Sequence, residues 1–134
     1  MKNVEHIGIA VKELEEAEKL FSNLFNSKPY KRETVASEGV LTSFFQVNQT
    51  KIELLQSTDP DGVIARFIEK KGEGFHHVAF EVDDIVSEMA RLKKEGFTLL
   101  SETPKTGADN KLVCFLHPKS TNGMLIELCQ EIKS

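Results

Sequence analysis

Four residues with metal-ligating side chains stand at matching places in the two halves of the chain. The interval from His6 to His77 is nearly the same as the interval from Glu53 to Glu127. Each histidine opens a strand-like apolar segment, and each glutamate stands between two apolar residues of another such segment. Two imidazoles and two carboxylates suit a borderline divalent ion, so we expect Co²⁺, Mn²⁺, Ni²⁺ or Zn²⁺. The pattern predicts one shared metal site with coordination positions open for water or substrate oxygens.

The segments around these residues repeat, which indicates two related modules. Residues 6–11 parallel 77–82, and residues 52–54 parallel 126–128. Both halves show the order strand, helix, strand, strand, strand. We therefore expect an α/β (α+β) fold in which two βαβββ modules form a curved mixed sheet around the metal site, with helices on the outer face. The expected single domain spans residues 1–134, with module one at about 4–56, a connecting helix at about 59–71 and module two at about 74–130.

Strand alternation decides which way the four candidate ligands point. Successive side chains of a strand face opposite sides of the sheet. Glu53 stands between an isoleucine and a leucine, and the other three candidates alternate with apolar residues in the same way. All four are therefore expected on the face opposite the large apolar side chains. His76 points to that other face, and His117 lies at a strand end before a proline, so neither is expected to be a ligand.

Hydrophobic periodicity predicts the elements that position these residues. Helices are expected over about 14–25, 62–70 and 84–95, and strands over 6–11, 30–35, 40–47, 51–56, 77–82, 97–100, 111–117 and 124–129. The apolar stripe of the first helix is expected to comprise Leu14, Ala17, Leu20, Phe21, Leu24 and Phe25. Asp83 is the expected N-cap of the third helix.

The composition is that of a folded globular protein: 40% of the residues are hydrophobic and 28% are charged. The net charge of −4 argues against nucleic acid or an anionic membrane as the main partner. No apolar run approaches a membrane span, and the N-terminus lacks the apolar core of a signal peptide. Cys114 and Cys129 fall in apolar strand-like runs, so we expect reduced core cysteines in a cytoplasmic protein.

At these residues the chain resembles the vicinal oxygen chelate (glyoxalase/bleomycin resistance/dioxygenase) superfamily, whose members pair βαβββ modules around a metal. The resemblance covers residues 4–130. Within the superfamily the chain is most similar to the methylmalonyl-CoA epimerase family. Residues 59–84 and 115–128 carry that closer resemblance, through the Gly74-Phe75-His76-His77 and Phe115-Leu116-His117-Pro118-Lys119 motifs.

The resemblance implies that His6, Glu53, His77 and Glu127 ligate a divalent ion, with no organic cofactor. It also implies 1,1-proton transfer at C2 of an acyl-thioester substrate, methylmalonyl-CoA, through a metal-stabilised enediolate, and a homodimer. Glu127 is the first candidate for a catalytic base. Some epimerases have a glutamate base where this chain has Thr42, and glutamine where it has Glu53. Glu53 is therefore the best second base, with Glu38 behind it.

Other functions remain open on the same scaffold. A glyoxalase I-like lactoylglutathione lyase, acting on a thiol hemithioacetal, shares the ligand set and the proton-transfer chemistry, but no segment resembles a glutathione site. A non-catalytic binding or resistance protein often lacks the four ligands. An extradiol dioxygenase needs two histidines and one carboxylate, so Glu53 counts against it. Three lysines are either surface residues or contacts for an anionic substrate: Lys105, Lys111 and Lys119.

Overall fold

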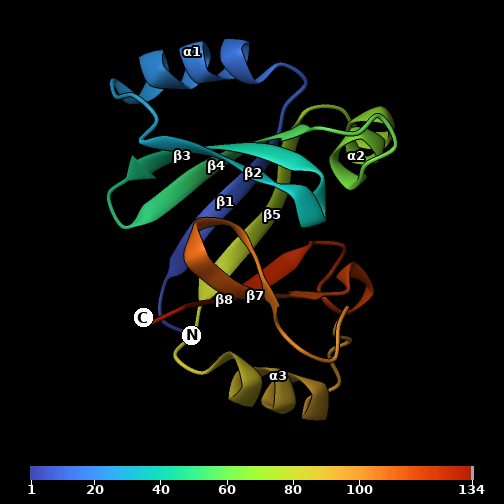
Figure 1. Cartoon of the computed structure of the whole chain (residues 1–134). Helices are drawn as coiled ribbons and strands as arrows, with labels where there is room; N and C mark the ends of the chain where they lie inside the picture. The colour runs from blue at the N-terminus through green and yellow to red at the C-terminus, as the bar shows by residue number, and fades with distance from the viewer. Residues whose placement is uncertain (134) are drawn as a thin grey trace. The chain divides into compact units, whose positions relative to one another are not determined.

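The computed structural model describes residues 1–133 (Figure 1). Its helices are α1 (Leu14–Phe25), α2 (Val63–Lys71) and α3 (Ile85–Lys94), and its strands are β1 (Val4–Ala10), β2 (Lys31–Val35), β3 (Val40–Val47), β4 (Thr50–Ser57), β5 (Gly74–Glu81), β6 (Lys105–Thr106), β7 (Lys111–Leu116) and β8 (Ile126–Glu131). The contacts divide the chain into two compact units. The first unit comprises residues 6–76, and the second comprises residues 1–5 and those from 77 onward.

Each unit contains a mixed four-stranded arrangement with the same connectivity. In the first unit the strand order is β2-β3-β4-β1, with β1 parallel to β4 and the other neighbours antiparallel. In the second unit the order is β5-β8-β7-β6, with β5 parallel to β8 and the other neighbours antiparallel. The two βαβββ modules and the α+β class predicted from the repeat are confirmed.

A helix covers the apolar face of the sheet in each unit (Figure 1). Leu14 of α1 packs with Phe45 and Leu54, which are completely buried in the first unit. In the second unit Met89 of α3 belongs to the buried cluster that contains Leu128. The apolar faces and the helices that cover them therefore lie where strand alternation predicts.

The predicted stripe of α1 is too wide. Leu20 is 60% exposed and Leu24 is 67% exposed, whereas Ala17, Phe21 and Phe25 pack on the sheet. Ala17, Phe21 and Phe25 follow one another at intervals of four residues and form the line of the helix that contacts the sheet. Leu20 and Leu24 each precede a stripe residue by one position, which turns them about 100° away from it.

The predicted cap of α3 is displaced by one residue. Asp84 is the N-cap, and its Oδ1 accepts a hydrogen bond from Ser87 N at 3.1 Å. Asp83 instead forms an ion pair with Lys2, with 3.1 Å between Oδ1 and Nζ. The helix begins at Ile85, whose backbone N–H is already satisfied by Gln130. This contact comes from β8, far along the chain, and local sequence chemistry could not reveal it.

The strand predicted over 97–100 is wrong. It is reduced to one bridge between Leu99 and Leu116, and regular pairing resumes only at β6, inside a predicted loop, where Lys105 pairs with Val113. The chain therefore uses twice as many residues to pass from Leu99 to Lys105 as β7 uses between their partners, Leu116 and Val113. The excess bulges out within 101–104, a stretch that ends in Pro104, which cannot donate to the ladder. Most of the remaining boundaries agree with the predictions within two residues, and the start of β5 differs by three.

Three short 3₁₀ turns occupy predicted turns and loops: Ala36–Glu38, Ala108–Asn110 and Pro118–Ser120. Both cysteines are buried thiols, as expected. Among the described residues, no helix combines the length and the apolar character needed to cross a membrane.

Candidate functional site: two buried histidine–glutamate pairs

The first unit brings His6 and Glu53 together from neighbouring parallel strands. Gly8 of β1 lies opposite Glu53 of β4, so His6, two residues earlier, shares its face of the sheet. His6 Nδ1 lies 3.1 Å from Glu53 Oε2, and the two side chains are only 5% and 6% exposed. An imidazole and a carboxylate are thus held side by side and almost free of solvent.

The second unit brings His77 and Glu127 together in the same way. Ala79 of β5 lies opposite Glu127 of β8, and His77 is two residues before it. His77 Nε2 lies 3.1 Å from Glu127 Oε1, and both side chains are 6% exposed. Phe115, opposite Glu127 on β7, packs edge-on against the His77 ring, with 5.8 Å between the ring centroids. This contact restricts the orientation of the imidazole.

The repeat seen in the sequence is therefore a repeat of strand register. The pairing of Gly8 with Glu53 in the first unit corresponds to the pairing of Ala79 with Glu127 in the second. Gly8 and Ala79 are separated in the sequence by the same interval as the two histidines. In both units the residue opposite the glutamate is small, which leaves room beside the carboxylate. Within each unit the two candidate ligands share one face of the sheet, as strand alternation predicts.

Two glutamines extend the repeat, and the sequence analysis missed them. Gln56 Oε1 accepts a hydrogen bond from Leu14 N, and Gln130 Oε1 accepts one from Ile85 N, both at 2.7 Å. Each glutamine lies three residues beyond a candidate ligand on the same strand and satisfies the first helical N–H of its unit. The signal was present, because the interval between the two glutamines equals the interval between Glu53 and Glu127.

The chemistry of the pairs suits a divalent metal ion. A neutral imidazole offers a nitrogen lone pair and a carboxylate offers charged oxygens, and both are ligands of borderline divalent ions. Burying a carboxylate is costly unless a hydrogen-bond donor or a cation compensates it. Each pair already holds its carboxylate against an imidazole, and two carboxylates together would balance the charge of one divalent ion.

The other histidines have structural roles. The His76 ring packs edge-on against Phe67 of α2, with 4.9 Å between centroids, on the face predicted for it. His117 Nδ1 accepts a hydrogen bond from Lys119 N at 3.0 Å and caps the 3₁₀ turn before β8. Lys111 pairs with Glu131, which is four residues beyond Glu127 on β8, so the Lys111 side chain lies on the same face of the sheet as Glu127. Lys105 and Lys119 are exposed.

Thr42 occupies the ligand face of the first unit. It lies on β3 opposite Leu55, which is two residues from Glu53 on β4. The threonine is 1% exposed, and its Oγ1 has no hydrogen-bond partner among residues 1–133. Glu38, the weaker candidate base, lies exposed in the 3₁₀ turn between β2 and β3.

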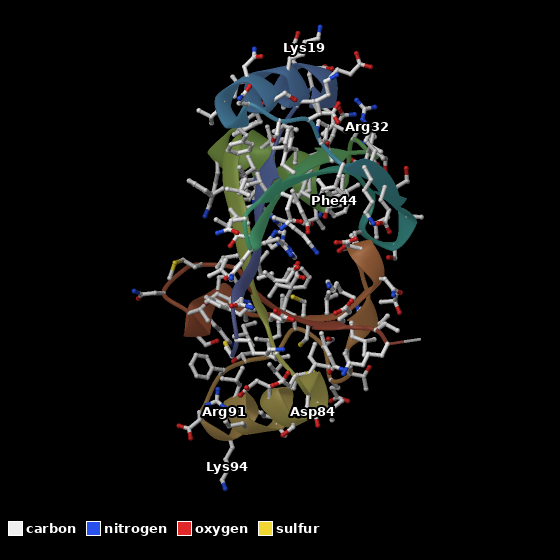
Figure 2. All side chains as sticks on the ribbon, turned by 90° about the vertical axis from the view of Figure 1, so that its left-hand side faces the viewer. Lys19, Arg32, Phe44, Asp84, Arg91 and Lys94 are labelled. Carbon is white, nitrogen blue, oxygen red and sulfur yellow. The ribbon has the colours of Figure 1, made fainter. Side chains whose placement is uncertain are left out.

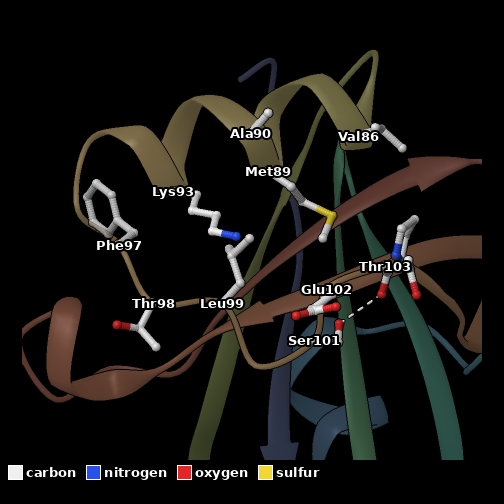
Figure 3. A pocket seen from close by; sticks show the side chains of 11 residues that line it. Val86, Met89, Ala90, Lys93, Phe97, Thr98, Leu99, Ser101, Glu102 and Thr103 are labelled. Atoms are coloured by element: carbon white, nitrogen blue, oxygen red, sulfur yellow. Dashed lines mark hydrogen bonds between the residues drawn. The ribbon is translucent and has the colours of Figure 1, made fainter.

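A cavity of about 730 Å³ in the second unit lies away from these residues. It is lined by Val86, Met89, Ala90 and Lys93 of α3 and by residues 97–99 and 101–104 (Figure 3). The Ser101 hydroxyl donates to Thr103 O across its floor at 2.9 Å. Because α3 packs on the apolar face of its sheet, this cavity is on the side opposite Glu127 and does not contain the histidine–glutamate pair.

Comparison with known proteins finds methylmalonyl-CoA epimerases among the relatives of this chain. The chain is 41% identical over 127 residues to the ethylmalonyl-CoA/methylmalonyl-CoA epimerase of Cereibacter sphaeroides, covering 93% of this chain and 95% of that protein. It is 40% identical over 126 residues to the human mitochondrial methylmalonyl-CoA epimerase, covering 93% of this chain and 72% of the relative.

A solved structure matches the whole fold. It is a variant of the Streptomyces coelicolor methylmalonyl-CoA epimerase in complex with 2-nitronate-propionyl-CoA, with a TM-score of 0.95 and 27% sequence identity, covering 100% of this chain and 99% of that one. The family model of the glyoxalase/bleomycin resistance protein/dioxygenase superfamily matches residues 5–115. With its paired βαβββ modules, the chain belongs to this superfamily.

Proposed function

We propose that this protein is an epimerase that interconverts the two C2 epimers of methylmalonyl-CoA by 1,1-proton transfer. The observation that carries the proposal is the register-matched pair of buried histidine–glutamate contacts, in a chain about 40% identical to methylmalonyl-CoA epimerases over nearly its full length. The proposed substrate is an acyl-CoA thioester, in agreement with the names of those relatives.

We propose that one divalent ion takes His6, Glu53, His77 and Glu127 as ligands. The repeat supports a shared ion, because each unit offers the same two donors in the same register and two donors are too few for a stable site. When bound, the ion would act as a Lewis acid on the thioester and carboxylate oxygens of the substrate. Whether it is Co²⁺, Mn²⁺, Ni²⁺ or Zn²⁺ is a matter for metal analysis.

Glu127 is the proposed base on one side of C2. Its carboxylate removes the C2 proton, so that the C–H bond breaks, an O–H bond forms, and the electron pair enters the enediolate of the substrate. Inversion requires a proton donor on the opposite side of the same carbon. Glu53, the counterpart of Glu127, is the candidate that the sequence offers for this second role.

Proton exchange at C2 tests the proposed reaction directly. Each epimer of methylmalonyl-CoA is incubated in D₂O with the Co²⁺-loaded protein, and the C2 proton is followed by NMR. We expect loss of the C2 proton signal from both epimers and formation of the opposite epimer. Absence of exchange, together with turnover of a methylglyoxal–glutathione adduct, would contradict the epimerase proposal and favour the lactoylglutathione lyase.

The metal distinguishes catalysis from simple binding. A purified protein that binds methylmalonyl-CoA but contains no stoichiometric metal and catalyses neither reaction would be a binding protein of the same superfamily. We further propose a cytoplasmic homodimer, which light scattering and cell fractionation test.

A further inference from the structure

The edge strand β2 places a glutamate on the ligand face of the first unit. Glu33 pairs with Thr42 of β3, and Thr42 pairs with Leu55 of β4. Residues directly opposite each other in an antiparallel pair point to the same face. Leu55 is two residues from Glu53 on β4, so the two side chains lie on the same face of the sheet. Glu33 therefore lies on the face that carries Glu53 and His6. No prediction from the sequence gave Glu33 a role.

The neighbours of Glu33 hold it at that face. Lys31 Nζ lies 3.4 Å from Glu33 Oε1 and 4.9 Å from the centroid of the Phe44 ring. Lys31 of β2 pairs with Phe44 of β3, and Phe44 pairs with Glu53 of β4. These three residues therefore lie side by side across the strands, next to the residues that pair with Glu33. Figure 2 shows Phe44 pointing away from α1, while Arg32 of β2 lies toward it. The Glu33 carboxylate therefore lies on the ligand side rather than under the helix.

The Thr42 hydroxyl gives the second observation. It is fully buried and lacks a partner in the described part of the chain, although leaving a buried hydroxyl unsatisfied is unfavourable. Side chains of directly opposed residues start about 4.5–5.5 Å apart. A carboxylate from Glu33 or an oxygen of a bound substrate would satisfy this hydroxyl.

We propose that Glu33 is the second acid–base residue of the epimerisation, with the Thr42 hydroxyl positioning its carboxyl group. This inference rests on the proposed function. In one direction the Glu33 carboxylate, which is paired with Lys31, removes the C2 proton from its face and the carboxyl group of Glu127 delivers a proton to the other. In the opposite direction Glu127 is the base. The protonation states of the two carboxyl groups are exchanged, and the reverse reaction or solvent restores them.

The variant Glu33→Gln separates the two faces of the carbon. We expect the epimer whose C2 proton faces Glu127 to keep exchanging with D₂O within a few-fold of the wild-type rate. Exchange of the other epimer should fall by at least about 100-fold, which is the usual contribution of a general base, and net epimerisation should fall equally. Metal content and melting temperature should stay unchanged, because Glu33 is on an edge strand and partly exposed.

A second variant moves the carboxylate across the strand pair. Adding Thr42→Glu to the Glu33→Gln protein places a carboxyl group one strand closer to Glu53. We expect this change to raise, at least about 10-fold, the exchange rate of the epimer that Glu33→Gln slows. The matched control is Glu16→Gln, an exposed glutamate on α1 of the same unit, which should behave as wild type.

Three results would overturn the inference. Wild-type exchange of both epimers in Glu33→Gln would show that another residue serves the second face, and the same asymmetric loss in Glu38→Gln or Glu53→Gln with metal retained would identify it. Equal loss for both epimers together with loss of metal would make Glu33 structural. Failure of the proposed function has a different signature, since the wild-type protein would then exchange neither epimer.

Discussion

At the scale of single residues, the glutamines Gln56 and Gln130 set where each sheet-covering helix begins. Each accepts a hydrogen bond from the first helical N–H of its unit. The two helices differ in what else caps them: Asp84 accepts from Ser87 at the start of α3, whereas Glu13 makes no side-chain cap at the start of α1. The first unit thus depends on its glutamine more than the second does.

Removing these glutamine amides tests that dependence. We expect Gln56→Ala to lower the free energy of unfolding by about 1–2 kcal/mol, the usual range for a lost helix cap. Gln130→Ala should cost less, because Asp84 still caps α3. Urea denaturation of both variants at pH 7 measures the difference. Gln46→Ala, on the strand before β4, is the control, since its amide bonds only the nearby Asn48 carbonyl. Equal losses in all three variants would contradict the cap assignment.

At the scale of elements, the two units dock their helices by different chemistry. In the first, Glu18 of α1 accepts hydrogen bonds from Arg32 of β2 and from the buried Ser43 of β3. The equivalent positions in the second unit, at the interval that separates His6 from His77, are Met89 and Cys114, which are buried in an apolar cluster. An ion pair in one unit is therefore replaced by apolar packing in the other, beside the cavity shown in Figure 3.

This difference predicts a pH-dependent contribution from Glu18. The Arg32 guanidinium, and then the Ser43 hydroxyl, hold the pKa of the Glu18 carboxyl below its ordinary value. A lowered pKa stabilises the fold at pH values above the ordinary carboxyl range, and that stabilisation is lost as the pH falls through the lowered value. We expect Glu18→Gln to be less stable than wild type at pH 7 and the difference to shrink as the pH falls toward 3.

Urea denaturation at pH 7, 5 and 3 measures this trend. Because Arg32 is largely exposed, the difference at pH 7 should be modest, and 0.5 M NaCl should reduce it. Glu16→Gln on the exposed side of α1 is the control. A difference for Glu18→Gln that stays constant from pH 7 to pH 3 would mean that packing rather than charge holds the helix.

At the scale of the whole molecule, a shared metal ion would tie the stability of one unit to residues of the other. We expect one Co²⁺ per chain by elemental analysis and a melting temperature that rises with Co²⁺; ligand at 100 times Kd stabilises by about 2.7 kcal/mol. Glu53→Gln and Glu127→Gln should each weaken Co²⁺ binding at least about 10-fold and reduce the thermal shift. Glu131→Gln, an exposed neighbour on β8, is the control.

The number of metal ions bound per chain distinguishes one shared ion from one ion in each histidine–glutamate pair. If each histidine–glutamate pair bound its own ion, the chain would hold two ions, and each variant would lose only one of them. Loss of all metal from either variant would support the shared site. If the wild-type chain holds one ion, full retention of that ion in Glu53→Gln would remove Glu53 from the ligand set.

The sequence predicted most of this fold because the information is periodic. Strand alternation placed Glu53 and Glu127 on the face opposite the helices, and duplication gave the connectivity of both units. What it could not predict depends on contacts between distant segments. The start of α3 is fixed by Gln130, the bulge before β6 by pairing with β7, and the exposure of Leu24 by which line of α1 contacts the sheet. Glu33 escaped notice because its meaning depends on the register of an edge strand.

The glutamine caps also bear on the fidelity of folding. A strand that slips by one residue turns every side chain to the opposite face. In a slipped β4, Glu53 would leave the ligand face and Gln56 would lose the N–H of Leu14 in the same step, so the error would weaken a strand and a helix together. β8 carries the same linkage through Glu127 and Gln130. Each unit therefore penalises a misaligned strand twice, and it does so before any metal or substrate is bound.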